Sequence, residues 1–413
     1  MHRRSLRALL ALTLGLSGAL VAAGARAQHH GHGHAIGRKS TCSEPVLACA
    51  RTVTPAFAAD GSLWIVFAAA ERVMVARSPD LGRSFEPAVE VTPGPQQLDW
   101  GPDSRPVMAV DAQGRVTVAY ATFKDKAFNG QVLVARSPDG RSFGPPRPIT
   151  ANTESQRFQA LGLDPEGRLL AVWLDKRNRP AARARGETYK GAALVYTWLD
   201  DRAQPDETGV IPAYDNTCEC CRLGLAFAGP GQPVVIFRNI FPGSIRDHAV
   251  VTFAGPTAPG PIRRVSDDQW KTDACPHQGP QISIAGSGSY HAVWFTNGAT
   301  RQGLFYARSD DAGERFSAPM PLGSDSRMPS RPSVIAHNFR VFLAWKEPDG
   351  QTSIVVGLRS EDDGRTWSRP ERLAEATGES DHPLLVASGS RIFLSWHSQG
   401  KEGYRLIELN QGS

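Results

Sequence analysis

Short apolar runs separated by turn residues fill most of the chain, and their order repeats. The second run of each repeat ends in a large aromatic residue, namely Phe67, Tyr120, Trp173, Phe237, Trp294, Trp345 and Trp396. The repeats follow one another at intervals of roughly 50 to 65 residues, a period typical of closed arrays of small sheets. Each repeat therefore predicts a strand, a glycine-containing turn, a strand ending in the aromatic, a loop, a third strand, a turn and a fourth strand.

The turn before the fourth strand has its own motif, Ser-x-Asp-x-Gly-x-x-aromatic. It occurs at 78–85, 309–316 and 360–367, and one residue shorter at 137–143. The aspartate can accept backbone N–H groups of its own turn, the glycine can adopt a positive φ, and the aromatic can pack the turn onto the sheet. These roles are structural, so the motif predicts a fold and no chemistry.

The motif resembles the Asp-box, or bacterial neuraminidase repeat, of the sialidase superfamily of β-propellers. That family contains exo-sialidases and also non-enzymes, such as sortilin-type receptors and a photosystem assembly factor. The resemblance and the repeats predict an all-β, seven-bladed β-propeller of four-stranded blades; the alternative is the six blades of the sialidase enzymes. The seventh repeat stops near Leu409 after its third strand, and we expect 45–48 to supply the missing one.

The N-terminal segment has the features of an export signal. Residues 1–27 combine three early arginines, an apolar core from Ala8 to Ala23 and an Ala-Arg-Ala cleavage site, so we expect a signal peptide of the Sec or twin-arginine type. Residues 28–41 form a His-rich tail, and residues 42–413 are expected to be a single propeller domain. The expected location is periplasmic or secreted, and no later apolar run is long enough for a membrane span.

The charge balance argues against nucleic acid as a partner. Removing the four arginines of 1–27 from the 46 basic residues leaves 42 against 41 acidic residues. The remaining partner classes are an acidic small molecule, a glycan, a metal ion or a periplasmic protein, and we expect a monomer.

Basic side chains recur at the entrance of the first strand of several repeats. They are Arg105, Arg157, Arg222 and Arg331, with His382 in a fifth repeat. In a closed ring these positions converge on one end of the central channel, where guanidinium groups could bind a carboxylate or phosphate. The alternative is that each arginine pairs with a loop carboxylate of a neighbouring blade.

The resemblance also implies what a catalytic site would contain. Sialidases hold the substrate carboxylate with three arginines, use a tyrosine nucleophile assisted by a glutamate, and use an aspartate as acid/base. The catalytic candidates here are Asp103, Asp175 and Glu347, and Asp99 and Asp381 are expected on the same face. No tyrosine with a glutamate partner emerges from the sequence, so sialidase-type hydrolysis of acidic sugars is an alternative function.

Six cysteines distinguish this chain from an ordinary propeller. Cys218, Cys220 and Cys221 directly precede Arg222, and the next repeat places Cys275 and His277 in the equivalent loop. One arrangement consists of disulfides, Cys42–Cys49 and Cys275 with one of the three. The other is a site for copper or zinc, formed by thiolates with His277, and a mixed redox-active site is a third arrangement.

The His-rich tail offers a second set of metal ligands. Cleavage after Ala27 would give an N-terminus that carries His29, His30, His32 and His34. A terminal amine, two amide nitrogens and the imidazole of the third residue form a square-planar set that suits Cu(II) or Ni(II). The alternative is a solvated tail with incidental affinity.

The sequence therefore predicts an exported propeller that binds a ligand or partner on a Cys/His/Arg-lined face, with copper or another transition metal as the most specific ligand. A sialidase-type glycoside hydrolase and a non-catalytic assembly or scaffold factor are the alternatives.

Overall fold

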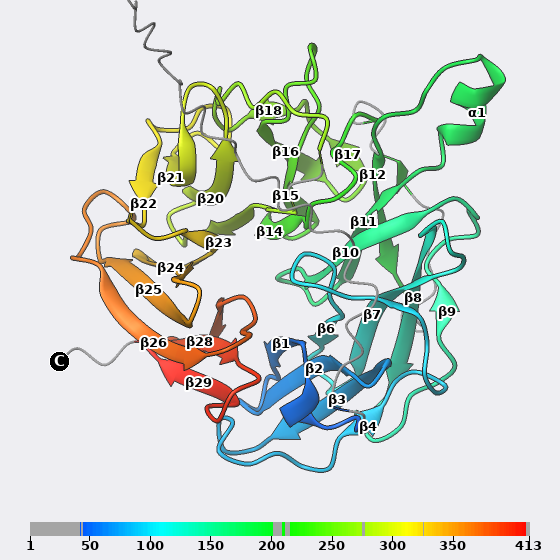
Figure 1. Ribbon diagram of the computed structural model, residues 1–413, viewed down its shortest axis with the longest axis vertical. Helices are drawn as coiled ribbons and strands as arrows, with labels where there is room; N and C mark the ends of the chain where they lie inside the picture. Colours follow the sequence, from blue (N-terminus) through cyan, green and yellow to red (C-terminus); the bar gives the residue numbers. More distant parts are fainter. Residues whose placement is uncertain are drawn as a thin grey trace, which may run out of the picture. The chain divides into compact units, whose positions relative to one another are not determined.

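The strands of the protein are arranged as a seven-bladed β-propeller. The computed structural model describes residues 42, 44–200, 209–210 (backbone), 215–274, 277–324 and 326–409. Within these residues the strands form seven antiparallel sheets that follow one another around a ring (Figure 1). The predicted seven-bladed propeller is confirmed, and the six-bladed alternative is wrong. The predicted signal peptide and His-rich tail lie outside the described residues.

The first three sheets follow the order of the chain. The first contains β1 (Thr52–Phe57), β2 (Leu63–Ala69), β3 (Arg72–Ser78) and β4 (Val89–Glu90). The second contains β5 (Leu98–Asp99), β6 (Val107–Val110), β7 (Val116–Phe123), β8 (Gly130–Ser137) and β9 (Arg147–Pro148), with β5 and β6 both pairing with β7. The third contains β10 (Gln156–Leu163), β11 (Leu169–Asp175), β12 (Ala193–Leu199) and β13 (Gly209–Val210).

The other four sheets complete the ring. The fourth contains β14 (Gly224–Gly229), β15 (Gln232–Arg238), β16 (His248–Gly255), β17 (Ala258–Pro259) and β18 (Arg263–Arg264), with β17 and β18 both pairing with β16. The fifth contains β19 (Gln281–Ile284), β20 (Tyr290–Asn297), β21 (Gln302–Ser309) and β22 (Met320–Leu322). The sixth contains β23 (Ser330–His337), β24 (Arg340–Pro348), β25 (Thr352–Ser360) and β26 (Glu371–Thr377), and the seventh β27 (Leu384–Ser388), β28 (Arg391–His397) and β29 (Tyr404–Glu408).

Helical structure among the described residues is short. It consists of the 3-10 turn η1 (Leu47–Cys49) and the helix α1 (Arg179–Ala184), which lies away from the centre of the ring (Figure 1). Neither these nor any other helix in the described ranges has the length and apolar character to cross a bilayer.

The hydrophobic core lies between neighbouring blades. All seven aromatic residues that mark the repeats lie on β2, β7, β11, β15, β20, β24 and β28, and none is more than 1% exposed. They contribute to clusters that each join two adjacent sheets, such as Ala119 and Val134 with Ala171 and Trp173. Burying an aromatic of this size stabilises the fold by about 2 to 3 kcal/mol, which explains why the position repeats.

The four repeated turns have the predicted hydrogen bonds. In the turn at 309–316 the N–H of Gly313 donates to Ser309 Oγ (2.9 Å) and the N–H of Arg315 donates to Asp311 Oδ1 (2.9 Å). Gly313 has a φ of 85°, where a side chain would be strained. The aromatic of the turn reaches the preceding blade, as Trp367 does when its ring meets Tyr306 at a centroid distance of 4.8 Å.

Within the described ranges, side-chain contacts close the ring and no strand is shared between the first and seventh blades. Residues 45–48 were expected to be the missing strand, but η1 occupies this segment and the Cys42–Cys49 disulfide closes it into a small loop. The seventh sheet has three strands within the described residues. Across the closure, Phe57 meets Phe393 at a centroid distance of 5.3 Å, and His397 Nε2 lies 2.9 Å from the carbonyl oxygen of Ala50.

A buried histidine joins the fifth and sixth blades. His291 on β20 is fully buried; its Nδ1 lies 2.8 Å from the hydroxyl of Tyr306 and its Nε2 lies 3.2 Å from Asp363 Oδ1. Asp363 also accepts hydrogen bonds from Ser289 (2.8 Å) and Arg308 (3.2 Å). Burial lowers the pKa of His291 to about 4, although the negative charge of Asp363 acts in the opposite direction.

This histidine should make stability depend on pH. Between pH 6.5 and about 4 the unfolded chain binds a proton at this position and the folded protein does not, so stability falls as pH falls. The groups that face the imidazole are Asp363, Arg308, Asp310 and Tyr306. Burial acts to raise the pKa of Asp363, but hydrogen bonds from Ser289 and Ser287 lower it below its ordinary value. Compared with His291→Gln, the wild-type protein should lose about 3 kcal/mol across the window in urea unfolding. Parallel pH profiles for the two proteins would contradict this, and His337→Gln is the control.

Candidate functional site

The three adjacent cysteines lie on a loop that is fixed between the third and fourth blades. Thr217 inserts between the start of β12 and the end of β15, where its N–H donates to the carbonyl oxygen of Ala192 (3.0 Å). The N–H of Cys218 donates to the carbonyl oxygen of Arg238 (2.8 Å). Gly191 permits this approach, because a Cβ there would lie 3.1 Å from the Cα of Asn216. The loop is therefore held by backbone hydrogen bonds on both sides.

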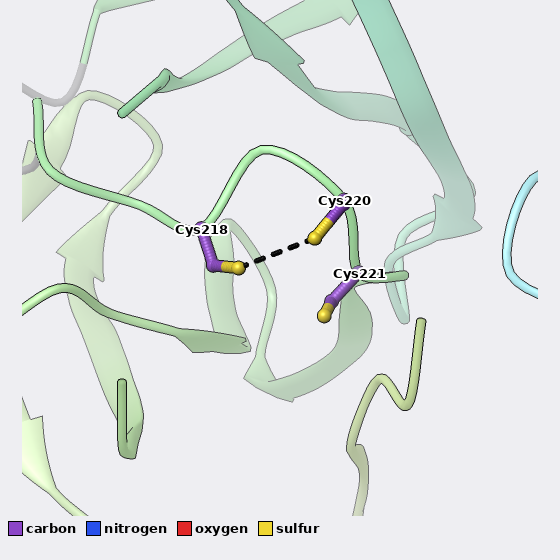
Figure 2. Close-up of side chains that lie close together, drawn as sticks. All are labelled: Cys218, Cys220 and Cys221. Carbon is purple, nitrogen blue, oxygen red and sulfur yellow. Dashed lines mark hydrogen bonds between the residues drawn. The ribbon is translucent and has the colours of Figure 1, made fainter. Parts of the chain in front are cut away.

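The thiols of this cysteine loop lie close together in the protein interior. The Sγ atoms of Cys218, Cys220 and Cys221 all lie within 4.8 Å of one another, and none of these three residues is more than 2% exposed. Figure 2 shows the Sγ atoms of Cys218 and Cys220 directed toward each other, with Cys221 beside them; the Cys218–Cys220 distance is 3.4 Å. Cys218 and Cys221 are free thiols. Their spacing brings three soft ligands to one point.

Two arginines place positive charge beside the thiols. Arg246 Nη1 donates to Cys218 Sγ at 3.2 Å, and Arg238 lies at the end of β15, next to the loop. Hydrogen bonds from the thiols of Cys220 and Cys221 hold the pKa of Cys218 well below its usual value; burial opposes this and the two guanidinium groups support it. The pKa of Cys221 is raised, first because its thiol donates to Cys218. The cluster thus favours one thiolate on Cys218.

The other predicted metal ligands are placed differently. His277 has its ring 6.4 Å from that of Phe158, which packs in the same buried cluster as the three cysteines. Among the described residues, the three cysteines have ligand atoms within 4.8 Å of one another, and this group includes no histidine or carboxylate. Cys275 and the tail residues His29, His30, His32 and His34 lie outside the described residues. The predicted Cys42–Cys49 disulfide is present.

Three of the predicted basic residues meet at Asp103. Arg222 and Arg331 form ion pairs with this carboxylate, and His382 contacts Arg222. Asp103 is 5% exposed and forms ion pairs with Arg222 (3.3 Å) and Arg331 (2.5 Å). Arg222 Nη1 also lies 3.2 Å from His382 Nδ1. Burial lowers the pKa of Arg222 to about 10 and that of His382 well below its usual value. The network links the second, fourth, sixth and seventh blades.

Two further arginines have carboxylate partners at the same end. Arg105 forms an ion pair with Asp381 through both oxygens, and Asp381 also accepts the N–H of Val53 (2.8 Å). Arg157 donates twice to Asp99, with its Nη2 2.9 Å from Oδ1. The interpretation that arginines pair with loop carboxylates describes these contacts. Arg105, Arg222, Arg331 and His382 also lie close enough to interact electrostatically with one another.

The remaining catalytic candidates have similar structural partners. Asp175 and Glu347 each follow a repeat tryptophan by two residues on the same strand, and each accepts its indole N–H, at 3.2 Å from Trp173 and 2.8 Å from Trp345. Asp175 is fully buried and also pairs with Arg177 (2.8 Å). These carboxylates anchor the tryptophans of the third and sixth blades.

The sequence did not single out Arg238 or Arg246. Arg238 ends an apolar run, Val234 to Phe237, where a charged residue usually marks the strand's arrival at the surface; it is instead 1% exposed. Arg246 stands in a loop without a distinctive pattern. The only sequence feature that marks Arg238 is its position directly after an apolar run, and that position predicts a solvent-exposed side chain.

Neither a family model nor a curated protein matches the chain. Among solved structures, the chain is similar to an ulvan lyase of family PL25, bound to -[GlcA(1-4)Rha3S]-, at a TM-score of 0.56 and 9% identity over 87% of this chain and 94% of that chain. The chain is also similar to the polysaccharide lyase Uly1, at a TM-score of 0.54 and 8% identity over 87% of this chain and 90% of that chain. For a Hadza microbial sialidase, Hz136, the TM-score is 0.47 and the identity is 16%, over 87% of this chain and 66% of that chain. The two lyases show a fold shared with carbohydrate-active propellers and do not single out the sialidases.

Proposed function

We propose that the protein binds a soft transition-metal ion, Cu(I) before Zn(II), through Cys218, Cys220 and Cys221. The observation that supports this is the gathering of three buried sulfur atoms within 4.8 Å of one another. Thiolates are the ligands that Cu(I), Zn(II) and iron–sulfur clusters favour in proteins. Three sulfurs from one loop provide a shell for one ion.

The expected export of the chain gives this function a biological setting. In an oxidising compartment adjacent thiols tend to become disulfides unless a metal or burial protects them. All three side chains here are buried, and the backbone hydrogen bonds of the loop limit their movement. After the proposed export, a bound soft ion would protect Cys218 and Cys221, which are free thiols in the structure, from oxidation.

The test is retention of metal by purified protein. The reduced protein, loaded anaerobically with Cu(I) and dialysed, should keep about one equivalent of copper by elemental analysis. Protein without residues 28–34 should keep the same amount, because the tail is a separate ligand set. Substitution of all three cysteines by serine should abolish retention. Loss of copper on removal of the tail, with none lost on removal of the thiols, would contradict the proposal.

A second candidate is binding of an acidic glycan at the channel end. It is supported by the fold shared with the two lyases and by the convergence of Arg105, Arg222 and Arg331. Their ion pairs with Asp103 and Asp381 would have to be exchanged for contacts with the sugar, which lowers the expected affinity. Calorimetric binding of a glucuronate-containing oligosaccharide, lost in Arg331→Ala and kept in Cys218→Ser, would favour this function over metal binding.

A further inference from the structure

Arg238 is a buried cation without a carboxylate partner in the described part of the chain. Its guanidinium stacks on the ring of Trp270 at 4.0 Å, and Nη2 donates to the neutral carbonyl oxygens of Gln278 (2.9 Å) and Phe295 (3.2 Å). The residue is 1% exposed. A buried charge without a counter-ion costs several kcal/mol, so a nearby anion is expected. The backbone carbonyl oxygen of Arg238 accepts the N–H of Cys218 (2.8 Å), and the thiols of the cysteine loop are neighbouring groups that can become anionic.

Arg246 brings a second positive charge to the same place. It is 6% exposed and contacts Cys218 Sγ through Nη1 at 3.2 Å. Its backbone N–H donates to the carbonyl oxygen of Trp270 (2.8 Å). The carboxylate of Asp247 next to it is directed elsewhere and accepts N–H groups of 268–270, each at 3.1 Å. The fourth blade and its loops therefore hold Arg246 against the thiols.

The formal charges of this site favour a monovalent ion. When a bound metal displaces the protons of all three thiols, the three thiolates and two guanidinium groups sum to −3 + 2 = −1, which a Cu(I) ion neutralises and a Zn(II) ion turns into +1. Excess charge is strongly disfavoured in a dry interior, where interactions between charges are little screened. Zn(II) also prefers four ligands, and three sulfurs leave one position to be filled.

We infer that Arg238 and Arg246 determine metal specificity, so that the cysteine loop selects Cu(I) over divalent Zn(II). The inference rests on the proposed function, because it assigns the charge of the ion that this same site binds. The two arginines act through charge and do not coordinate the metal.

The experiment compares the affinities for two metals in arginine variants. Cu(I) affinity is measured anaerobically by competition with bicinchoninate, and Zn(II) affinity by competition with a chromophoric chelator. Removing one guanidinium by Arg246→Met should raise the ratio of Zn(II) to Cu(I) affinity about a hundred-fold, since a divalent ion is repelled by one charge more than a monovalent ion. Arg246→Lys keeps the charge and should leave the ratio near that of the wild type.

Arg238→Met should change the ratio in the same direction. Arg405→Met is the matched control, since Arg405 also lies over a tryptophan ring, 5.1 Å from Trp396, and donates to the carbonyl oxygen of Glu375 (2.7 Å). If Arg238→Met does not fold, the Arg246→Met and Arg246→Lys pair still decides the matter. An unchanged ratio in Arg246→Met would overturn the inference while leaving metal binding intact. Failure of the wild type to bind either ion would instead overturn the proposed function.

Discussion

Replacing Cys218 by serine is expected to lower the affinity for Cu(I) by about a thousand-fold. Closed thiolate and imidazole sites bind with about 10 to 16 kcal/mol, so loss of one of three sulfurs should cost about 4 kcal/mol. Cys218 should be the most sensitive position, because it carries the depressed pKa and the contact with Arg246. Competition titration with bicinchoninate under anaerobic conditions measures the change.

The control for this substitution removes sulfur from elsewhere in the protein. Cys42 and Cys49 form a disulfide near the start of the first blade, and the double serine variant should keep Cu(I) affinity within a few-fold of the wild type. Equal losses in the two variants would mean that copper does not depend on the cysteine loop. An unchanged affinity in Cys218→Ser would have the same meaning.

Replacing Asp103 by alanine is expected to destabilise the propeller by about 3 to 5 kcal/mol. The carboxylate is 5% exposed and pairs with Arg222 and Arg331, so its removal leaves two largely buried guanidinium groups without their counter-ion. The N–H of Gly279 would also lose its acceptor, at 3.3 Å. Urea unfolding followed by tryptophan fluorescence gives the free energy.

An exposed ion pair supplies the comparison for Asp103. Asp267 is paired with Arg264 at 2.5 Å and its side chain is 63% exposed, so Asp267→Ala should cost less than about 1 kcal/mol. Similar losses for Asp103→Ala and Asp267→Ala would show that the channel network contributes no more than a surface pair. The account of the channel arginines as structural anchors would then be wrong.

The fold was predictable from the sequence because the same buried aromatic recurs in every repeat and the same turn motif in four of them. An aromatic such as Trp294 recurs at one register position in every blade, and a turn such as 309–316 fixes the connection that follows. The closing segment was mispredicted because it does not repeat. A disulfide and the 3-10 turn replace a strand there, and the contacts that close the ring, such as Phe57 with Phe393, join residues far apart in the chain.

The candidate site was predictable in part. The repeat positions were enough to predict that arginines gather at the channel end. They did not predict which carboxylate pairs with each arginine, because the positions of Asp99, Asp103 and Asp381 depend on the conformation of each loop. The cysteine loop was evident from Cys218 to Cys221. The burial of Arg238 was not evident, because neighbouring loops determine whether the last residue of a strand is buried; here the loop that carries Trp270 covers it.

X-ray absorption at the copper edge tests the central claim most directly. Protein loaded with one equivalent of Cu(I), with the tail present, is compared with the variant that lacks the three thiols of the cysteine loop. The account predicts a first shell dominated by sulfur in the wild type, from Cys218, Cys220 and Cys221, and loss of that shell in the variant. A shell made of nitrogen or oxygen alone in the wild-type protein would contradict it.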